Sequence, residues 1–213
     1  MKILSLSGFA QQPEILNQYL DNCQDIDFMK LNYSELENKI IEFKPDIIIG
    51  WSIGAMLALK ISQKIKVKKL ILISGFKKFI SDSKTQANFD NLKKILNQDK
   101  EKFLNHFTKL IYFADSNAKE IKSKLNIINN SEDNLKYWFN FLEQEQAKIE
   151  TKNIGQSLII HGDKDIISNS ENSSIMKNEL GNSSLEIFKD SSHCPFFSQE
   201  DKFKQIINEF INN

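Results

Sequence analysis

The sequence lacks arginine, has only two cysteines among 213 residues, and carries no net charge. Its 28 basic residues are all lysines and are balanced by 28 acidic residues, so no global field indicates a nucleic-acid or membrane-surface partner. Cys23 and Cys194 are too few for a disulfide framework or a four-thiolate metal site, which favours reduced thiols in a cytosol. No apolar run approaches the about 20 residues of a membrane span or forms a signal peptide. These absences predict a soluble cytoplasmic protein that binds neither nucleic acid nor membrane.

Several motifs of cofactor chemistry are also missing. The sequence has no Walker motif, no dinucleotide-binding glycine pattern and no His-Glu-x-x-His helix. Nucleotide and zinc chemistry therefore have no support, and we expect neither a cofactor nor a metal ion.

What the sequence does contain is an alternation of short apolar runs with longer amphipathic segments. Its length, with 40% hydrophobic and 26% charged residues, suits one globular domain with a sizeable core. We predict strands at residues 2–7, 26–31, 46–50, 69–74, 157–161 and 184–188. We predict helices at residues 14–22, 34–43, 54–63, 172–180 and 200–211. Because several strands are continuously apolar, we expect an α/β fold with a mostly parallel central sheet flanked by helices.

Two helix starts have local support. Pro13 suits the first turn of a helix because its missing N–H would be unpaired there in any case. Ser34 followed by Glu37 has the spacing of a capping box, in which each side chain accepts from the other residue's backbone N–H. The predicted helices at 14–22 and 34–43 are therefore expected to begin near these residues.

The alternation is interrupted once, between residues 76 and 154. No convincing strand occurs there, whereas large apolar residues repeat at helical spacing. We predict that residues 76–154 form a helical cap inserted in a core made of residues 1–75 and 155–213. Because ligands of open α/β sheets bind at the carboxyl edge, the cap is expected to cover that edge.

A Gly-x-Ser-x-Gly pattern, Gly50-Trp51-Ser52-Ile53-Gly54, joins the predicted strand at 46–50 to the helix that follows. In this context the serine sits on a strained turn, and the glycines let strand and helix approach closely. The hydroxyl is thereby presented at a helix N-terminus, where developing negative charge is favoured. The pattern predicts that Ser52 is a nucleophile; the alternative is a glycine-bounded turn with a capping serine.

A serine nucleophile needs a base, and the sequence offers three histidines. His106 lies in a predicted cap helix, where a structural or partly exposed role is expected. His161 ends a buried strand, where a histidine more often bonds neighbouring backbone. His193 follows the last strand, in a loop that returns to the carboxyl edge. We therefore assign the base to His193.

The acid that orients the base should lie between the serine and the histidine in chain order. The strand at 157–161 runs into Gly162-Asp163-Lys164-Asp165, which places carboxylates at the carboxyl edge. We favour Asp165 because it lies farther along the loop, whereas Asp163 is the natural turn-capping residue. Turn chemistry alone also explains aspartates at both positions.

An oxyanion hole requires two backbone N–H groups. One is expected from Ile53, directly after the nucleophile, and the other from Phe9 in the loop after the first strand, where Gly8 permits the turn. The phenyl ring of Phe9 is expected to form a wall of the substrate pocket.

These residues resemble the α/β-hydrolase superfamily across nearly the whole chain: Ser52 in its elbow, Gly8-Phe9, His161-Gly162-Asp163-x-Asp165 and the late His193. Within that superfamily, further features resemble the pimeloyl-acyl-carrier-protein methyl ester esterases of biotin synthesis: the elbow sequence, the length of the helical insert and His193-x-Pro195-Phe196 followed by Ser198. Two positions depart from the pattern. Ser7 stands where a histidine often precedes the oxyanion glycine, which puts the hydrogen bonding around the hole in doubt. Ala55 stands where a further glycine is frequent, which is a steric change only.

The resemblance implies an α/β-hydrolase fold and a serine carboxylesterase that hydrolyses the methyl ester of pimeloyl-acyl-carrier protein. A general short- or medium-chain carboxylesterase or thioesterase is the main alternative, and a non-catalytic hydrolase-fold binding protein is another. The expected partners are a small acyl ester and an acyl carrier protein, and we expect a monomer.

Two sets of residues are candidates for recognising such a substrate. Aromatic residues could line an acyl pocket, although aromatic residues at helical spacing are more often plain core; the candidates are Trp51, Phe107, Phe113, Trp138 and Phe141. Residues 77–124 hold 11 lysines against six acids. This excess predicts a docking surface for an acidic carrier, with a solvated helical face as the alternative. The docking candidates are Lys93, Lys94, Lys100 and Lys102.

Overall fold

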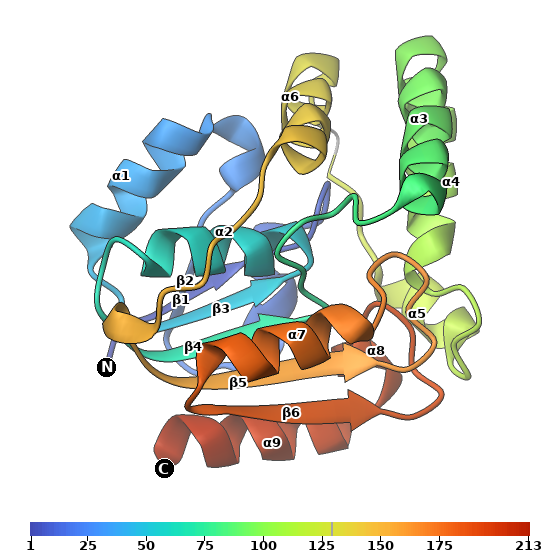
Figure 1. The fold of residues 1–213 in the computed structure, drawn as a ribbon. Helices are drawn as coiled ribbons and strands as arrows, with labels where there is room; N and C mark the ends of the chain where they lie inside the picture. The colour runs from blue at the N-terminus through green and yellow to red at the C-terminus, as the bar shows by residue number, and fades with distance from the viewer. Residues whose placement is uncertain (129) are drawn as a thin grey trace.

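The structure is a computed structural model that describes residues 1–128 and 130–213. Its centre is a six-stranded sheet in the order β2-β1-β3-β4-β5-β6, in which every neighbouring pair of strands is parallel (Figure 1). The strands are β1 (Ile3–Leu6), β2 (Cys23–Asp25), β3 (Ile47–Trp51), β4 (Val67–Ile73), β5 (Ile154–Gly162) and β6 (Ser183–Phe188). The sheet and its surrounding helices confirm the predicted α/β fold class.

Helices cover both faces of the sheet, which explains why its central strands are apolar on both sides. All residues of β3 are buried. On one face lie α1 (Tyr33–Phe43), α2 (Ile53–Ser62) and α7 (Glu171–Leu180), and on the other lies α9 (Glu200–Asn212) (Figure 1). Shorter helical elements are η1 (Pro13–Tyr19), η2 (Phe28–Lys30), η3 (Thr151–Asn153) and α8 (Pro195–Ser198). Within the described parts of the chain, every helix falls short of the length and apolar character that a membrane crossing demands.

Most predicted elements are found within a few residues of their expected bounds, but three details were wrong. The predicted strand at 26–31 is instead a 3-10 turn, η2, preceded by the short strand β2. Its apolar residues are buried for another reason: Phe28 packs edge-on against Trp138 at 5.0 Å. The predicted helix at 14–22 is the 3-10 helix η1, with Pro13 in its first turn. The capping box of α1 is formed by Asn32 and Glu35, two residues before the expected pair.

Helices dominate the chain between β4 and β5. They are α3 (Ser83–Gln98), α4 (Lys100–Ile111), α5 (Ala118–Lys124) and α6 (Glu132–Gln144). Asp99 ends α3 and caps α4 by accepting the Lys102 N–H. The helices share an aromatic cluster in which Phe89 stacks on Phe139 at 4.2 Å and Phe103 meets Phe139 edge-on.

This helical block stands beyond the carboxyl ends of the strands, where α3, α4 and α5 lie in Figure 1. The block therefore lies where a cap is expected to lie. Residue 129, inside the predicted cap, falls outside the described residues. The domain bounds 1–75, 76–154 and 155–213 stay a prediction.

Candidate active site

Ser52 occupies a sharp turn between β3 and α2. Its φ of 59° and ψ of −120° put it in a backbone conformation that non-glycine residues rarely adopt, and its N–H donates to the Ile73 carbonyl at 2.9 Å. The flanking glycines are sterically required. A Cβ on Gly50 would lie 2.3 Å from the Gly54 carbonyl oxygen, and one on Gly54 would lie 2.2 Å from the Leu6 carbonyl oxygen. The Gly-x-Ser-x-Gly pattern is thus explained by the close approach of β3, α2 and β1.

Asp165, and not Asp163, lies against His193. The His193 Nδ1–H donates to Asp165 Oδ2 at 2.7 Å, and the other carboxylate oxygen accepts the N–H groups of Ile167 and Ser168. Asp163 is instead partly buried, with Oδ2 3.5 Å from Lys189 Nζ. The loop after β5 therefore delivers one aspartate to the histidine and leaves the other to the turn.

The Asp165 carboxylate is fully buried, yet it is held in the charged form. Burial alone would raise its pKa. The charge of His193 and the hydrogen bonds from His161 and His193 outweigh that effect and hold the pKa of Asp165 well below its ordinary value. A permanently ionised carboxylate is what a neighbouring imidazolium needs for stabilisation.

A second buried histidine, His161, contacts the same carboxylate oxygen, which the sequence did not lead us to expect. Its Nε2 lies 3.1 Å from Asp165 Oδ2 and 2.6 Å from the Ser168 carbonyl oxygen. Because both neighbours are acceptors, Nε2 carries the hydrogen, and the Ser173 hydroxyl then donates to Nδ1 at 2.5 Å. The bond to nearby backbone was predicted, whereas the contact with Asp165 was missed. The four-residue spacing of His161 and Asp165 across the Gly162 turn was the sequence feature that could have indicated this contact.

His193 is buried and held at several points. Its backbone N–H donates to the Ile111 carbonyl at 3.2 Å, and its own carbonyl accepts the Trp51 indole N–H at 2.7 Å. The rings of Trp51 and His193 are 5.8 Å apart, so the histidine lies beside the residue that directly precedes Ser52. Its Nε2 is buried without a hydrogen-bond partner among the described residues, and no hydrogen bond between Ser52 and His193 is formed within them. Bonds of this kind often tighten only once a substrate is bound.

The two expected oxyanion donors, the N–H groups of Phe9 and Ile53, have no protein acceptor in the described part of the chain. Ile53 is the first residue of α2, where an N–H has no intrahelical partner. Phe9 lies in a turn closed by the bond from the Gln11 N–H to the Gly8 carbonyl. The Ser7 hydroxyl also reaches the Gln11 carbonyl, at 3.4 Å, so Ser7 supports this turn in its own way.

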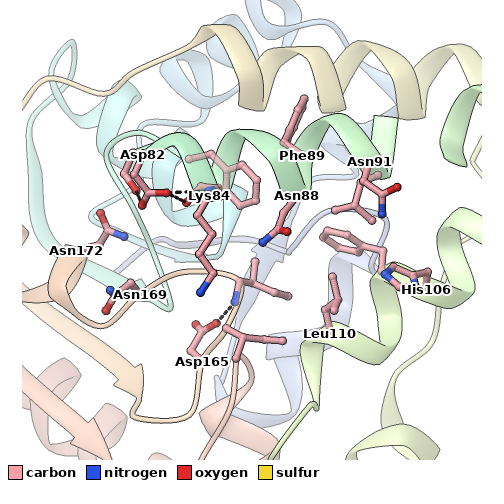
Figure 2. Close-up of a pocket in the computed structure, with 17 residues that line it drawn as sticks. Asp82, Lys84, Asn88, Phe89, Asn91, His106, Leu110, Asp165, Asn169 and Asn172 are labelled. Carbon is pink, nitrogen blue, oxygen red and sulfur yellow. Dashed lines mark hydrogen bonds between the residues drawn. The ribbon is translucent and has the colours of Figure 1, made fainter. Parts of the chain in front are cut away.

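A cavity of about 420 Å³ opens beside the Asp165 loop, bounded by α3, α4 and the start of α7 (Figure 2). Its lining combines apolar and polar side chains, among them Phe79, Phe89, Phe107, Leu110, Lys84, Asn88, Asn91, His106, Asn169 and Asn172. Figure 2 shows the Lys84 side chain extending from α3 toward the loop of Asp165. Ser52 and His193 do not line this cavity; Phe107, which does, also packs on Phe9 at 5.3 Å. The cavity therefore adjoins the site across the ring of Phe107.

Phe107 is the one predicted pocket aromatic that lines this cavity, and the other four lie outside its lining. Trp51 is buried between His193 and Phe196. Trp138 donates its indole N–H to the Leu31 carbonyl, and Phe141 packs against Tyr33. Phe113 is 57% exposed and lies away from the cavity.

The ring of Phe9 was also expected to line the pocket. It packs against Phe103, Phe107 and Phe139. Helical spacing is the same for core and for lining residues, so the sequence pattern does not separate the two.

The four candidate docking lysines are not equivalent. Lys93 forms an ion pair with Glu143 on α6, and Lys100 Nζ donates to the Asn130 carbonyl at 3.2 Å, so both contact other parts of the helical block. Lys94 and Lys102 are exposed.

In the described chain, no group of three or more His, Cys, Asp or Glu side chains is arranged to hold a metal ion.

The chain is similar in sequence to known esterases. A pimeloyl-[acyl-carrier protein] methyl ester esterase from Nitrosospira multiformis is 24% identical over 184 residues, which cover 79% of this chain and 70% of that protein. The enzyme of the same name from Legionella pneumophila (strain Corby) is 26% identical over 191 residues, 85% of this chain and 77% of that protein. No protein-family model matches the chain.

Solved structures give the fold. An esterase from Exiguobacterium antarcticum superposes with a TM-score of 0.79 at 18% identity, over 100% of this chain and 92% of that one. MenH from S. aureus superposes with a TM-score of 0.74 at 18% identity, over 99% of this chain and 93% of that one. The chain has the α/β-hydrolase fold, and in sequence it resembles the pimeloyl methyl ester esterases.

Proposed function

We propose that this chain is a serine carboxylesterase that hydrolyses the methyl ester of a pimeloyl group carried on acyl carrier protein. The observation that carries the proposal is the placement of Ser52 on its strained turn beside an assembled Asp165–His193 pair, at the carboxyl edge of the sheet. The methyl ester and the carrier come from the names of the relatives, which share about a quarter of their residues with this chain over most of its length.

The proposed reaction has two halves. Ser52 Oγ attacks the ester carbonyl carbon while its proton passes to His193 Nε2, and Asp165 stabilises the resulting imidazolium. The N–H groups of Phe9 and Ile53 stabilise the oxyanion of the tetrahedral intermediate. His193 returns the proton to the leaving methoxide oxygen, so methanol departs and an acyl-serine remains. Water then attacks the acyl-serine by the same route, releasing the carboxylic acid and restoring the Ser52 hydroxyl.

A non-catalytic binding protein with a vestigial site is the contrasting function. The bond from the His193 Nδ1–H to the buried Asp165 carboxylate argues against it, because a binding site with no proton to transfer does not need an oriented imidazole. A general carboxylesterase or thioesterase would use the same residues and differs only in the substrate.

The experiment that tests the proposal combines active-site labelling with a substrate panel. A fluorophosphonate should form an adduct on Ser52, located by mass spectrometry, and Ser52→Ala should lose about 10⁴-fold or more in hydrolysis. Ser34→Ala, at an exposed serine of α1, is the matched control and should keep full activity.

The panel compares methyl esters of short, medium and pimeloyl chains, free and attached to acyl carrier protein. Highest kcat/KM for the carrier-bound pimeloyl methyl ester is expected. Higher kcat/KM for free short-chain esters or for thioesters would support the general hydrolase instead. An adduct on another residue, or an active Ser52→Ala variant, would remove the serine mechanism.

A further inference from the structure

Asp115 is a buried carboxylate in the turn between α4 and α5, where the mechanism above does not use it. Four donors surround it. One oxygen accepts the backbone N–H of Ser192 at 2.6 Å and lies 2.9 Å from the Ser192 hydroxyl. The other accepts the Asn117 N–H at 2.8 Å and the Ser198 hydroxyl at 3.0 Å. Ser192 and Ser198 follow Asp115 by 77 and 83 residues, so these bonds join the helical block to the C-terminal part of the core.

The backbone around Asp115 makes further bonds to the same loop. The Ile111 carbonyl accepts the His193 N–H at 3.2 Å and lies 2.7 Å from the Ser192 hydroxyl. The Ser116 N–H donates to the Asp190 carbonyl at 3.2 Å. The segment 111–116 thus contacts the loop at residues 190, 192 and 193, on the side of His193 that leads back toward β6.

We infer that Asp115 is a positioning residue for the base His193, and this inference rests on the proposed function. Three supports hold the histidine and the peptide that precedes it. Asp165 holds Nδ1 of the ring, Trp51 holds the carbonyl, and Asp115 holds the peptide N–H one residue before it. An ionised carboxylate that accepts from backbone N–H forms a charge-assisted bond, stronger than a neutral one. Without it, the loop would hold His193 Nε2 less accurately toward Ser52.

The position of Asp115 also links the base to the cavity beside the Asp165 loop. Helix α4 ends at Ile111, four residues before Asp115, and its residues His106, Phe107 and Leu110 line the cavity. A ligand that fills the cavity therefore contacts the same helix whose C-terminal end supports His193. The helical block contributes to the placement of the base as well as to covering the carboxyl edge.

The test is Asp115→Asn, which preserves size but replaces one acceptor oxygen with an amide group that cannot accept. We expect kcat for a small methyl ester such as dimethyl pimelate to fall about 10- to 100-fold while KM stays within about two-fold. Fluorophosphonate labelling of Ser52 should slow in parallel. Asp99→Asn is the matched control, because Asp99 belongs to the same helical block and its carboxylate accepts the local N–H of Lys102, with no hydrogen bond to the His193 loop among the described residues.

A readout independent of turnover is the proton NMR signal of the His193 Nδ1–H. In Asp115→Asn it should broaden or shift, and in Asp99→Asn it should match the unmodified protein. This signal separates the inference from the proposed function, since it reports the loop even if the chain hydrolyses none of the esters in the panel.

Smaller changes keep the inference testable if Asp115→Asn fails to fold. Ser192→Ala removes a donor beside His193, whereas Ser198→Ala removes one on α8, so the first should lower kcat more than the second. Full kcat with an unchanged Nδ1–H signal in Asp115→Asn would overturn the inference. An equal loss of kcat in Asp99→Asn, or no difference in kcat between the two serine variants, would also overturn the inference.

Discussion

The carboxylate of Asp165 receives four N–H groups, two from backbone and two from imidazoles, and none of its surface reaches solvent. Asp165→Asn should therefore lower kcat by on the order of 10³ to 10⁴, because an amide can stabilise the wrong tautomer of His193 and cannot balance its charge. Asp163→Asn should change kcat only a few-fold, since that side chain lies against Lys189 and the bond to His193 comes from Asp165. Steady-state kinetics of both variants on one methyl ester decide the matter. A larger kinetic loss in Asp163→Asn would reverse the assignment.

His161 gives a second prediction at this scale. His161→Leu removes the N–H that faces Asp165, and we expect kcat to fall roughly 10-fold through a less firmly held carboxylate. His161→Gln keeps an N–H donor near the position of Nε2 and should recover most of that loss. The two variants should be compared for kcat and for thermal stability. If both lose the same activity, His161 serves packing alone.

At the scale of elements, the site depends on how closely α2 approaches β1. Gly54→Ala places a methyl group 2.2 Å from the Leu6 carbonyl oxygen and 2.4 Å from that of Ser7, so the start of α2 must move away from the strand. We expect a stability loss of about 3 kcal/mol or more, with loss of Ser52 labelling, as for an overpacked core position.

The neighbouring change Ala55→Gly is the control. It adds no atom and should cost only about 1 kcal/mol through helix propensity. Urea denaturation and fluorophosphonate labelling measure the two effects. Normal labelling in Gly54→Ala would show that the turn tolerates the displacement.

The sequence could predict those parts of the site whose sequence signals lie within one short stretch of the chain. The elbow at Ser52, the loop of Asp165 and the loop of His193 each follow a strand, so parallel topology alone brings them to one edge. The strand prediction for residues 26–31 was wrong because an apolar run looks the same whether it packs in a sheet or against a helix. Phe28 packs against a helix. Asn32–Glu35 and Ser34–Glu37 share one spacing, so the pattern could not choose between them.

The contacts that complete the site could not be predicted in this way. Asp115 reaches the His193 loop from 77 residues away in the chain, and no periodicity encodes that distance. The candidate pocket aromatics show the same limit, because helical spacing indicates an apolar face and not whether that face packs in the core or lines a pocket.

At the scale of the whole molecule, positive and negative charges balance, but residues 77–124 of the helical block carry more lysines than acidic residues. If an acidic carrier docks there, Lys94→Glu with Lys102→Glu should raise KM for the carrier-bound ester and leave a free methyl ester nearly unaffected, because both side chains are exposed. Raising the salt concentration should weaken the carrier-bound reaction in the same way. The control is Lys39→Glu with Lys177→Glu, because both lysines are exposed and lie outside the helical block. Equal effects on the two substrates would leave a solvated face as the explanation of the lysines.

The contact between Trp51 and His193 should allow the base to be followed by tryptophan fluorescence. Trp51 is one of only two tryptophans, so Trp138→Phe leaves it as the sole indole fluorophore. With the two rings 5.8 Å apart and the indole N–H bonded to the histidine carbonyl, an imidazolium should quench the emission by accepting an excited electron, whereas neutral imidazole should not. We expect emission to fall on acidification, and this dependence should vanish in His193→Gln. The tryptophan of the elbow would then report, in the resting protein and without any substrate, when the base is ready to take a proton.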